Sequence, residues 1–371
     1  MSLILITGGA GFIGSHMADK LIDEGYDVRI LDNLQKPVHM KGMPEYINPK
    51  ADFILGDVRS KTDIEKSLKD VSYVYHLAAY QDYLLDFSTF FHTNVVSTAL
   101  IYEIIVEKKL PIKKVIIASS QFVQGEGLYK KQDGSMVAVD LRPMEQLVRG
   151  DWNCKDENGE DMKWQWTPES HANPPNAYAM SKYSQELQAL RFGKRYDIPS
   201  VAMRYSIVQG PRQSFYNAYS GACRIFSLSY FFNKAPIIFE DGQQLRDFVN
   251  IHDVIDANYL VLNDSRADYN AFCVGGGKAY SVIDFDRIVA KVFRKDELQP
   301  NIPGEFRFGD TRNACSDISK IRNLGFEPKR SADDSVMEYK EYLEAQTDIE
   351  DIINYANEKM KQLNVIRKTS R

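Results

Sequence analysis

Short, almost wholly apolar runs alternate with amphipathic segments along the first two hundred residues. Runs without polar alternation are typical of parallel strands that helices cover on both faces, and apolar residues every three or four positions are typical of those helices. The pattern therefore predicts an α/β protein built on a doubly wound parallel sheet. The expected strands are Leu3–Ile6, Tyr26–Leu31, Ala51–Leu55, Tyr73–Leu77, Lys114–Ser120 and Ile198–Tyr205, and the expected helices are Ser15–Glu24, Lys61–Leu68, Ser88–Lys108 and Tyr178–Tyr196.

The first predicted strand runs directly into a turn with glycines at Gly8, Gly11 and Gly14. Between a strand and a helix, this spacing allows a tight turn, a close approach to a pyrophosphate, and close packing of the helix on the sheet. Asp32 follows about 20 residues later, where a carboxylate hydrogen-bonds the adenosine ribose. We therefore predict a Rossmann-type dinucleotide site, with an ordinary βα turn as the alternative. Its first residues are Gly8, Gly11, Phe12, Ile13, Gly14, Asp32 and Asn33.

Further cofactor contacts are expected where the later strands end, because ligands of open α/β sheets bind at that edge. Asp57 is expected to touch the adenine, and it could equally cap the helix that follows. His76 stands within an apolar strand and is expected to be a buried structural histidine. No Arg or Lys is adjacent to Asp32 to bind a 2′-phosphate, which favours NAD over NADP. These further contacts are Asp57, Val58, Leu77, Ala78, Ala79 and Asn94.

The regular alternation is interrupted over residues 127–175, which are polar and carry all three tryptophans. So many aromatic residues indicate an ordered insertion, since disordered linkers contain few. We expect an NAD-binding domain over 1–210 that contains this insertion, and a smaller mixed α/β substrate-binding region over 211–371. Some of the chain is expected to return to the first domain near 245–275. Within the second region the pattern predicts helices at 222–233 and 254–263, a short strand at 236–239 and a helical hairpin before the C-terminus.

Composition narrows the class of partner. The formal charge of −5 argues against a nucleic-acid partner. The four cysteines form no CxxC pair and are expected to be reduced thiols, so neither a disulfide framework nor a metal site is predicted. No run approaches the roughly 20 apolar residues that span a bilayer, so we expect a cytoplasmic protein without a membrane partner. A solvated, frayed C-terminus is expected to hold Lys361, Arg367, Lys368 and Arg371.

Tyr178 and Lys182 are four residues apart, so they share one face of a predicted helix. A nearby ammonium lowers the pKa of a phenol, which lets the phenolate act as a base near neutral pH. A serine hydroxyl at the end of the strand over residues 115–117 can hydrogen-bond the same substrate oxygen. Together the three groups suit proton removal from an alcohol while its carbon gives hydride to a nicotinamide. The alternative is an ordinary helix surface.

These motifs resemble those of the extended short-chain dehydrogenase/reductases of the nucleotide-sugar epimerase/dehydratase family. The resemblance runs from Ile4 to about Lys329. It implies that Ser120, rather than Ser119, is catalytic with Tyr178, and that Lys182 also holds the nicotinamide ribose. It places Gln121, Arg246 and Arg312 at the substrate, with the arginines on the diphosphate; a surface salt bridge is the alternative for either arginine. The matching segments are Thr7–Gly14, Gly56–Val58, His76–Ala79, Ser119–Gly125, Tyr178 with Lys182, Arg246–Val249 and Gly309–Arg312.

The family's dehydratases have an Asp-Glu pair directly after the catalytic hydroxyl, where this chain has Gln121 and Phe122. The Glu of the family's decarboxylases is missing too. Epimerisation at carbon 4 needs no further acid or base, so the resemblance favours a 4-epimerase. The insertion and the segment 239–248 resemble those of bacterial dTDP-L-rhamnose 4-epimerase-type enzymes. A nucleotide-sugar dehydrogenase or reductase with net redox change, and a non-catalytic NAD-binding sensor, are the alternatives.

Two departures leave the sugar and the base open. Gln124 and Gln209 stand where the family commonly has Tyr, and Ile207 stands where it commonly has a substrate-binding Asn. The resemblance also implies a homodimer, formed by the helices expected at 88–108 and 178–196. Tyr183, Leu187 and Leu190 are candidates for the apolar stripe of that contact, or they face their own sheet.

Overall fold

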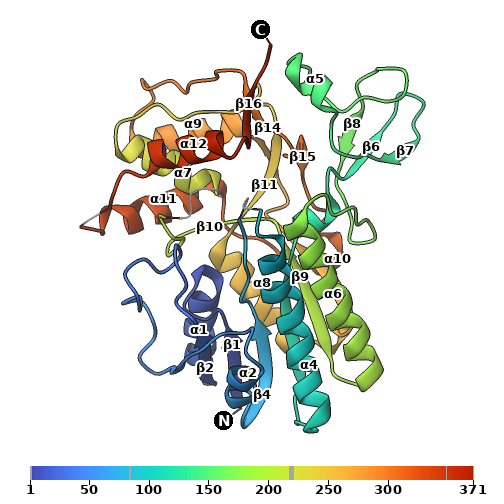
Figure 1. Cartoon of the computed structure of the whole chain (residues 1–371), viewed down its shortest axis with the longest axis vertical. Helices are drawn as coiled ribbons and strands as arrows, with labels where there is room; N and C mark the ends of the chain where they lie inside the picture. The colour runs from blue at the N-terminus through green and yellow to red at the C-terminus, as the bar shows by residue number, and fades with distance from the viewer. Residues whose placement is uncertain (1, 83–84, 217–220, 348, 371) are drawn as a thin grey trace.

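The computed structural model describes residues 2–82, 85–216, 221–347 and 349–370. Its central feature is a parallel sheet of seven strands in the order β12-β9-β5-β4-β1-β2-β3, which confirms the predicted fold class (Figure 1). The strand order reverses between β1 and β4, which is where doubly wound sheets bind their ligands. The strands are β1 (Leu3–Thr7), β2 (Asp27–Asp32), β3 (Asp52–Leu55), β4 (Val71–His76), β5 (Lys114–Ser120), β9 (Ser200–Tyr205) and β12 (Asn270–Val274).

Helices cover both faces of this sheet and form two separate apolar cores. Helices α1 (Phe12–Asp23) and α8 (Ile251–Asn263) pack together on one face. Helices α2 (Lys61–Ser67), α4 (Ser97–Glu107) and α6 (Ala177–Tyr196) cover the other face. Along β1, Ile4 and Ile6 belong to the first core, whereas Leu5 belongs to the second. This alternation explains why the strand is apolar at every position.

A continuous helical run precedes the fifth strand: α3 (Phe87–Phe90), the π-helical turn η1 (Phe91–Val96) and α4. The expectation that no run approaches the length of a membrane span was wrong: the helical run over Phe87–Glu107 meets that length and composition, and 44% of its apolar window is buried inside the protein. Its Ile101, Ile104 and Ile105 side chains lie in the core under the sheet. The apolar character of the run is thus accounted for by its packing on the sheet.

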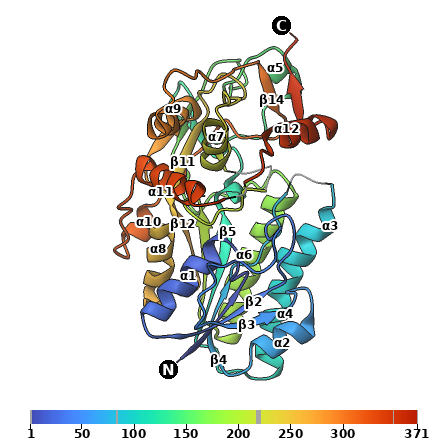
Figure 2. The ribbon, with the colours of Figure 1, turned by 90° about the vertical axis from the view of Figure 1, so that its left-hand side faces the viewer.

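The C-terminal region lies beyond the sheet and has its own apolar core, built on α7 (Ala222–Phe231), α9 (Val282–Phe293) and α11 (Ala332–Glu344) (Figure 2). A small sheet joins it to the first domain: β10 (Ile207–Gln209), β11 (Leu245–Asn250), β13 (Ala279–Ser281) and β15 (Asn313–Ala314). Between these strands the chain returns to the large sheet, because α8 and β12 occupy residues 251–274. Two short helical segments, η3 (Ser265–Ala267) and α10 (Ser319–Arg322), complete this part.

The insertion is an ordered three-stranded sheet in the order β7-β6-β8, with one short helix. Its elements are β6 (Leu128–Lys130), β7 (Met136–Ala138), α5 (Met144–Val148) and β8 (Lys163–Gln165), and the 3₁₀ turn η2 (Gln121–Gln124) links it to β5. Gly125, just before the insertion, has a φ of +60°, and an added Cβ would lie 2.2 Å from the carbonyl oxygen of Asn173. The entry to the insertion therefore requires a glycine.

Three expectations about the second half were wrong. Residues 236–239 form no strand, because Ile237 makes only an isolated bridge to Asn301. The chain ends in a strand rather than a helical hairpin: after α12 (Ile353–Gln362), β16 (Ile366–Lys368) pairs with β14 (Glu305–Arg307). The basic tail is therefore ordered. The amino group of Lys368 lies 3.5 Å from the Glu305 carboxylate, and Arg371 is outside the described residues.

Candidate functional site

The glycine turn follows β1 directly and is tightly constrained. Gly8 has a φ of +69°, and an added Cβ would lie 2.7 Å from the backbone of Ala78 on the neighbouring strand's end. A Cβ on Gly14 would lie 2.2 Å from the carbonyl oxygen of Gly8. A Cβ on Gly11 would lie no closer than 3.3 Å to that oxygen. Gly8 and Gly14 are thus required by the turn itself, whereas Gly11 leaves room for a ligand above it.

A cavity of about 320 Å³ opens above this turn, at the carboxyl ends of β1, β2 and β4. Its lining brings together residues that are far apart in the sequence. From the predicted set it includes Gly8, Gly11, Phe12, Ile13, Gly14, Asp32, Asn33, Asp57, Val58, Leu77, Ala78 and Ala79. Asn94, Tyr178 and Lys182 do not line it. A cavity with a glycine floor, small side chains and a carboxylate at one end fits the pyrophosphate and adenosine of a dinucleotide.

Asp32 is held in place from two sides. Its carboxylate accepts hydrogen bonds from the backbone N–H groups of Ala10, at 3.0 Å, and Leu34, at 2.9 Å. The Nε2 atom of the buried His39 lies 3.8 Å from Asp32 Oδ1. His39 also lines the cavity, as do Lys36 and Arg59. Sequence reasoning missed these three residues, since neither the loop after Asp32 nor the short connection after β3, which holds Arg59, has a periodicity that would place them.

Asp57 is paired rather than used as a helix cap. Its carboxylate forms an ion pair with Arg59 at 2.6 Å and accepts a hydrogen bond from Asn33 Nδ2 at 3.0 Å. The hydrogen bonds from Arg59 lower the pKa of Asp57 to about 2. Helix α2 is capped by Ser60, whose hydroxyl accepts from the backbone N–H of Asp63. The alternative role of Asp57 as the cap was therefore wrong.

Asn94 lies behind the cavity wall rather than in it. Its carboxamide bonds both backbone groups of Tyr80, at 2.8 and 3.1 Å, and the Ser181 hydroxyl at 2.9 Å. Tyr80 lines the cavity, so Asn94 positions a lining residue against α6. His76 is buried between the hydroxyls of Thr7 and Ser97, at 2.7 and 2.9 Å. Burial lowers the pKa of His76 to about 3, which agrees with the structural role expected for it.

Ser120, Tyr178 and Lys182 lie together where β5 meets α6. Ser120 is the last residue of β5. Helix α6 starts just before Tyr178, because Asn176 caps it by accepting a hydrogen bond from the Ala179 N–H at 2.9 Å. One turn further along α6, the ammonium of Lys182 donates to the carbonyl oxygen of Ala118 in β5 at 2.7 Å. This contact ties the helix face that carries both residues to the strand that carries Ser120.

The electrostatics of this group differ from the expectation. Burial raises the pKa of Tyr178 to about 12, while a hydrogen bond from Ser120 opposes the shift. Burial also lowers the pKa of Lys182 to about 7. The expectation that Lys182 lowers the pKa of the Tyr178 phenol was therefore wrong for the protein without its cofactor. The ammonium is buried against a backbone carbonyl and the Gln185 side chain, and its own charge is disfavoured there.

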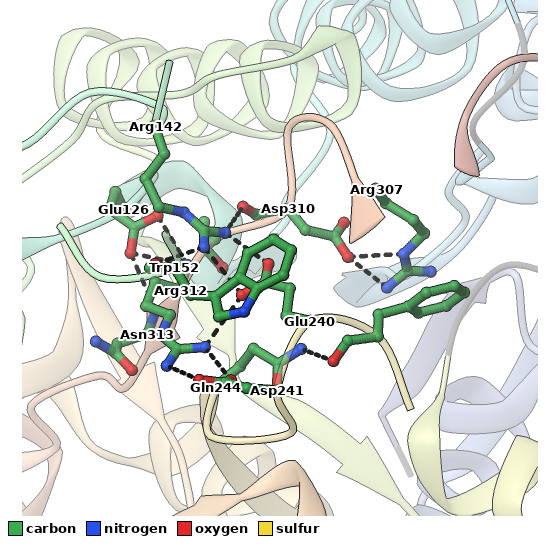
Figure 3. Close-up of polar contacts among 12 residues, drawn as sticks. Glu126, Arg142, Trp152, Glu240, Asp241, Gln244, Arg307, Asp310, Arg312 and Asn313 are labelled. Atoms are coloured by element: carbon green, nitrogen blue, oxygen red, sulfur yellow. Dashed lines mark hydrogen bonds and ion pairs between the residues drawn. The ribbon is translucent and has the colours of Figure 1, made fainter. Parts of the chain in front are cut away.

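The two predicted diphosphate arginines have different surroundings. The guanidinium of Arg246 donates only to backbone carbonyls among the hydrogen bonds of the described residues: those of Leu245, Thr311 and Arg312. Arg312 is buried, and its terminal nitrogens bond the carboxylates of Glu240 and Asp241 and the amide oxygen of Asn153 (Figure 3). These contacts match the salt bridge that is the alternative for Arg312, except that the pair is buried rather than at the surface.

Gln121 is the candidate that stands next to Ser120. It is 4% exposed, and neither atom of its amide has a hydrogen-bond partner among the described residues. Burying an amide without a hydrogen-bond partner costs free energy. A ligand whose polar groups hydrogen-bond the Gln121 amide would therefore bind favourably there. The ring of Phe122 contacts that of Tyr178 edge to face, with centroids 6.4 Å apart. The two residues that replace the dehydratase carboxylates thus lie at the catalytic group.

The two glutamines that stand where the family commonly has Tyr differ in their hydrogen bonding. Gln124 is saturated: its amide nitrogen donates to the carbonyl oxygens of Thr167 and Pro168, and its oxygen accepts from Ser316. Gln209 is fully buried without a partner for its amide among the described residues. Ile207 packs against the core of the C-terminal region. In place of the family's Tyr ring, Gln124 therefore links the insertion to the C-terminal region by hydrogen bonds.

No group of three His, Cys, Asp or Glu side chains that could hold a metal ion occurs within the part of the chain that the structure describes. Cys154, Cys223, Cys273 and Cys315 are all buried free thiols.

Comparison with known proteins agrees with this site. The model of the NAD-dependent epimerase/dehydratase family matches residues 4–146 and 156–275. A dTDP-L-rhamnose 4-epimerase of Burkholderia thailandensis is 31% identical over 352 residues, which is 93% of this chain and 96% of the relative. A putative UDP-glucose 4-epimerase of Methanocaldococcus jannaschii is 35% identical over 334 residues, 88% of this chain and 93% of the relative.

Among solved structures, the UDP-glucose 4-epimerase of Thermotoga maritima with UDP-glucose superposes with a TM-score of 0.75 at 30% identity. That match covers 92% of this chain and 98% of the other. The UDP-glucuronic acid 4-epimerase of Bacillus cereus, in complex with UDP-glucuronic acid and NAD, superposes with a TM-score of 0.74 at 25% identity, over 92% and 99% of the two chains. With the family model covering well over half of its length, this chain belongs to the NAD-dependent epimerase/dehydratase family.

Proposed function

We propose that the protein is an NAD-dependent nucleotide-sugar 4-epimerase that works through a transient 4-keto sugar. The observation that carries this proposal is the grouping of Ser120, Tyr178 and Lys182, with Gln121 and Phe122 in place of further acids or bases. Such a site can move one proton on and off a hydroxyl, and it lacks the carboxylates with which the family's dehydratases expel water. The curated relatives and several solved structures are named as 4-epimerases, which supports the same reaction.

In this mechanism Tyr178 takes the proton of the C4 hydroxyl and later returns it to the rebuilt hydroxyl on the other face. Ser120 hydrogen-bonds the same oxygen and favours the phenolate form of Tyr178. Lys182 supports the helix face that holds Tyr178, through its bond to the Ala118 carbonyl. NAD, when bound, would supply the hydride acceptor and donor.

We further propose NAD rather than NADP as the cofactor. The carboxylate of Asp32 faces the ribose end of the cavity and would repel a 2′-phosphate. Lys36 and Arg59 are the cations that line this end, and Arg59 is already paired with Asp57. Release of NAD, and not NADP, from the denatured protein would support this choice, whereas recovery of NADP would overturn it.

For the nucleotide sugar, we propose that Arg246 contacts the diphosphate and Gln121 the sugar. Arg246 is half-buried, and the carbonyls that hold it leave its charge uncompensated. Gln121 offers a buried amide without a partner beside the catalytic serine. We therefore propose one arginine, Arg246, at the diphosphate, where the resemblance implied both Arg246 and Arg312.

The experiment is conversion of nucleotide sugars by the purified protein without added NAD. dTDP- and UDP-linked hexoses are incubated with the protein, and the C4 configuration of the sugar is followed by NMR. The proposal expects the 4-epimer to form, and Tyr178→Phe to lower kcat by a factor of about 10² to 10⁴. One NADH formed per sugar would instead indicate the net oxidoreductase. Full biological activity of Tyr178→Phe would indicate the non-catalytic sensor.

We also propose that the protein is a homodimer that pairs through α4 and α6, which lie side by side (Figure 1). Val96, the last residue of η1 before α4, and Met180 and Leu187 on α6 expose between 39% and 46% of their surface. Leu190, expected in the same stripe, instead packs against the core of its own sheet, and Tyr183 is half-buried. A dimer mass by light scattering, converted to a monomer by Leu187→Asp, would support the pairing. A monomer at micromolar concentration would contradict it.

We propose a cytoplasmic location, as a soluble enzyme. The buried free thiols and the packing of the apolar helix run into the core support this. Recovery in the soluble fraction after lysis at low and high salt is expected, and recovery in the membrane fraction would contradict it.

A further inference from the structure

Glu126 lies six residues beyond the catalytic Ser120 and is almost completely buried, with 2% of its surface exposed. Its carboxylate accepts hydrogen bonds from three donor groups. The backbone N–H of Arg312 donates to both oxygens, at 2.9 and 2.8 Å, and that of Asn313 donates to Oε1 at 3.0 Å. The Tyr129 hydroxyl donates to Oε1 at 2.7 Å. A buried carboxylate that accepts several N–H bonds is a strong anchor for the chain that donates them.

The segment 311–313 that Glu126 holds by its N–H groups is the one whose carbonyls hold Arg246. Arg246 Nη2 donates to the carbonyl oxygen of Thr311 at 2.9 Å, and Nη1 donates to that of Arg312 at 3.1 Å. The two peptide groups that flank Arg312 therefore donate their N–H groups to Glu126 and accept from Arg246 through their carbonyl oxygens. This segment runs beside β11, where Arg246 pairs with Ala314.

These bonds also set the direction of the Arg246 guanidinium. The hydrogen bonds that the described residues make use Nη1 twice and Nη2 once. Among the described residues they leave Nε–H and one hydrogen of Nη2 without an acceptor, and these two nitrogens are neighbours in the guanidinium plane. Two neighbouring donors of this kind form a fork that matches two oxygens of a phosphate. The strength of that bidentate contact depends on the plane in which the guanidinium is held.

We propose that Glu126 is a positioning residue for the substrate's diphosphate: it fixes the segment 311–313, which in turn orients the Arg246 fork. This rests on the proposed function, since it takes Arg246 as the diphosphate contact. The turn that carries Ser120 and the segment that carries the diphosphate fork are thereby built as one unit. Binding of the nucleotide and alignment of the sugar at Ser120 are coupled through it.

The test compares two buried glutamates that both bond to Arg312, Glu126 through the backbone N–H and Glu240 through the side chain. In Glu126→Gln an amide nitrogen takes the place of Oε2 and meets the backbone N–H of Arg312. The loss of charge also weakens the hydrogen bonds to the remaining oxygen, so the segment 311–313 shifts. Glu240→Gln is the matched control, because Glu240 is equally buried but bonds the side chains of Arg142 and Arg312. Affinities for UDP and for dTDP are measured separately by calorimetry, together with KM, kcat, NAD content and thermal midpoint.

For whichever of the two nucleotides binds the unchanged protein, we expect Glu126→Gln to weaken binding at least tenfold. It should raise KM by a similar factor, while kcat changes less than threefold and NAD content stays the same. Glu240→Gln should lower the thermal midpoint with little change in nucleotide affinity. Combining Glu126→Gln with Arg246→Gln should weaken binding no further than Arg246→Gln alone, because both act on one contact.

Equal effects of the two glutamate variants on nucleotide affinity, or additive effects of Glu126→Gln and Arg246→Gln, would overturn the inference. Where Glu126→Gln does not fold, Tyr129→Phe removes one donor to the same carboxylate. It is expected to weaken nucleotide binding two- to fivefold, and unchanged binding would count against the proposal. If Arg246→Gln itself leaves nucleotide binding unchanged, the diphosphate contact of the proposed function fails instead, which keeps the two failures distinct.

Discussion

Arg142 and Glu240 form a bidentate ion pair in which Nη2–Oε1 is 2.8 Å and Nη1–Oε2 is 2.9 Å, and both side chains are 2% exposed. Arg142 comes from the insertion and Glu240 from the C-terminal region. The Arg142 guanidinium also donates to the carbonyl oxygens of Trp152 and Asp310 (Figure 3). The pair is therefore the centre of the contact that seats the insertion on the C-terminal region.

Removing one member of this pair should be costly, since the other charge stays buried. We expect Arg142→Met to lower the free energy of unfolding by about 3 kcal/mol, measured by urea denaturation. Lys131→Met is the control, because the Lys131–Glu157 pair within the insertion lies at the surface. Equal midpoints for Arg142→Met and the unchanged protein would show that the pair does not hold the insertion.

The glycine turn predicts two different outcomes for two alanine substitutions. Gly14→Ala places a Cβ 2.2 Å from the Gly8 oxygen, so it should destabilise the fold as well as abolish cofactor binding. Gly11→Ala meets nothing closer than 3.3 Å, so the protein should keep its thermal midpoint without cofactor and lose most of its bound NAD. NAD released on denaturation and the midpoint of cofactor-free protein are measured for both. Full NAD content in Gly11→Ala would contradict the placement of the pyrophosphate.

Lys182 predicts a pH dependence of stability in the cofactor-free protein. Its pKa is lowered to about 7 on folding, so between pH 7 and the ordinary lysine pKa the unfolded chain binds the proton and the folded chain does not. The free energy of unfolding should therefore rise with pH across this window, by about 1.4 kcal/mol per pH unit from this group.

Lys182→Met removes that contribution. Its free energy of unfolding relative to the unchanged protein should fall by about 3 kcal/mol between pH 7 and pH 9.5. Lys20→Met, in the last turn of α1, is the comparison variant. Parallel pH profiles for Lys182→Met and the unchanged protein would show that Lys182 is charged in the fold over the whole range.

The parts that sequence predicted well depend on local patterns. The apolar run of β1 and the glycines after it lie within a dozen residues, and Tyr178 and Lys182 lie one helical turn apart. The parts that it missed depend on contacts between distant residues. Arg142 and Glu240 are separated by 98 positions, and Arg312 meets Glu126 across 186. No local periodicity marks such pairs, so the partners of Arg142 and Arg312 could not be predicted from the pattern of the chain.

The error over Tyr178 has a different physical origin. Its spacing from Lys182 correctly placed the two side chains on one helix face, but spacing carries no information on burial. In the folded chain burial raises the pKa of the phenol, and the same burial lowers the pKa of Lys182. At neutral pH the phenol therefore keeps its proton, and the proposed proton transfer needs a positive charge beside the ring.

The central claim is that hydride leaves carbon 4 and returns to it within one turnover. The direct test uses dTDP-L-rhamnose and UDP-glucose carrying deuterium at C4 of the sugar, incubated with the protein without added NAD. We predict that at least one of them yields its 4-epimer with the deuterium retained at C4 and without accumulation of NADH. Loss of the label to solvent, or one NADH per converted sugar, would contradict the account.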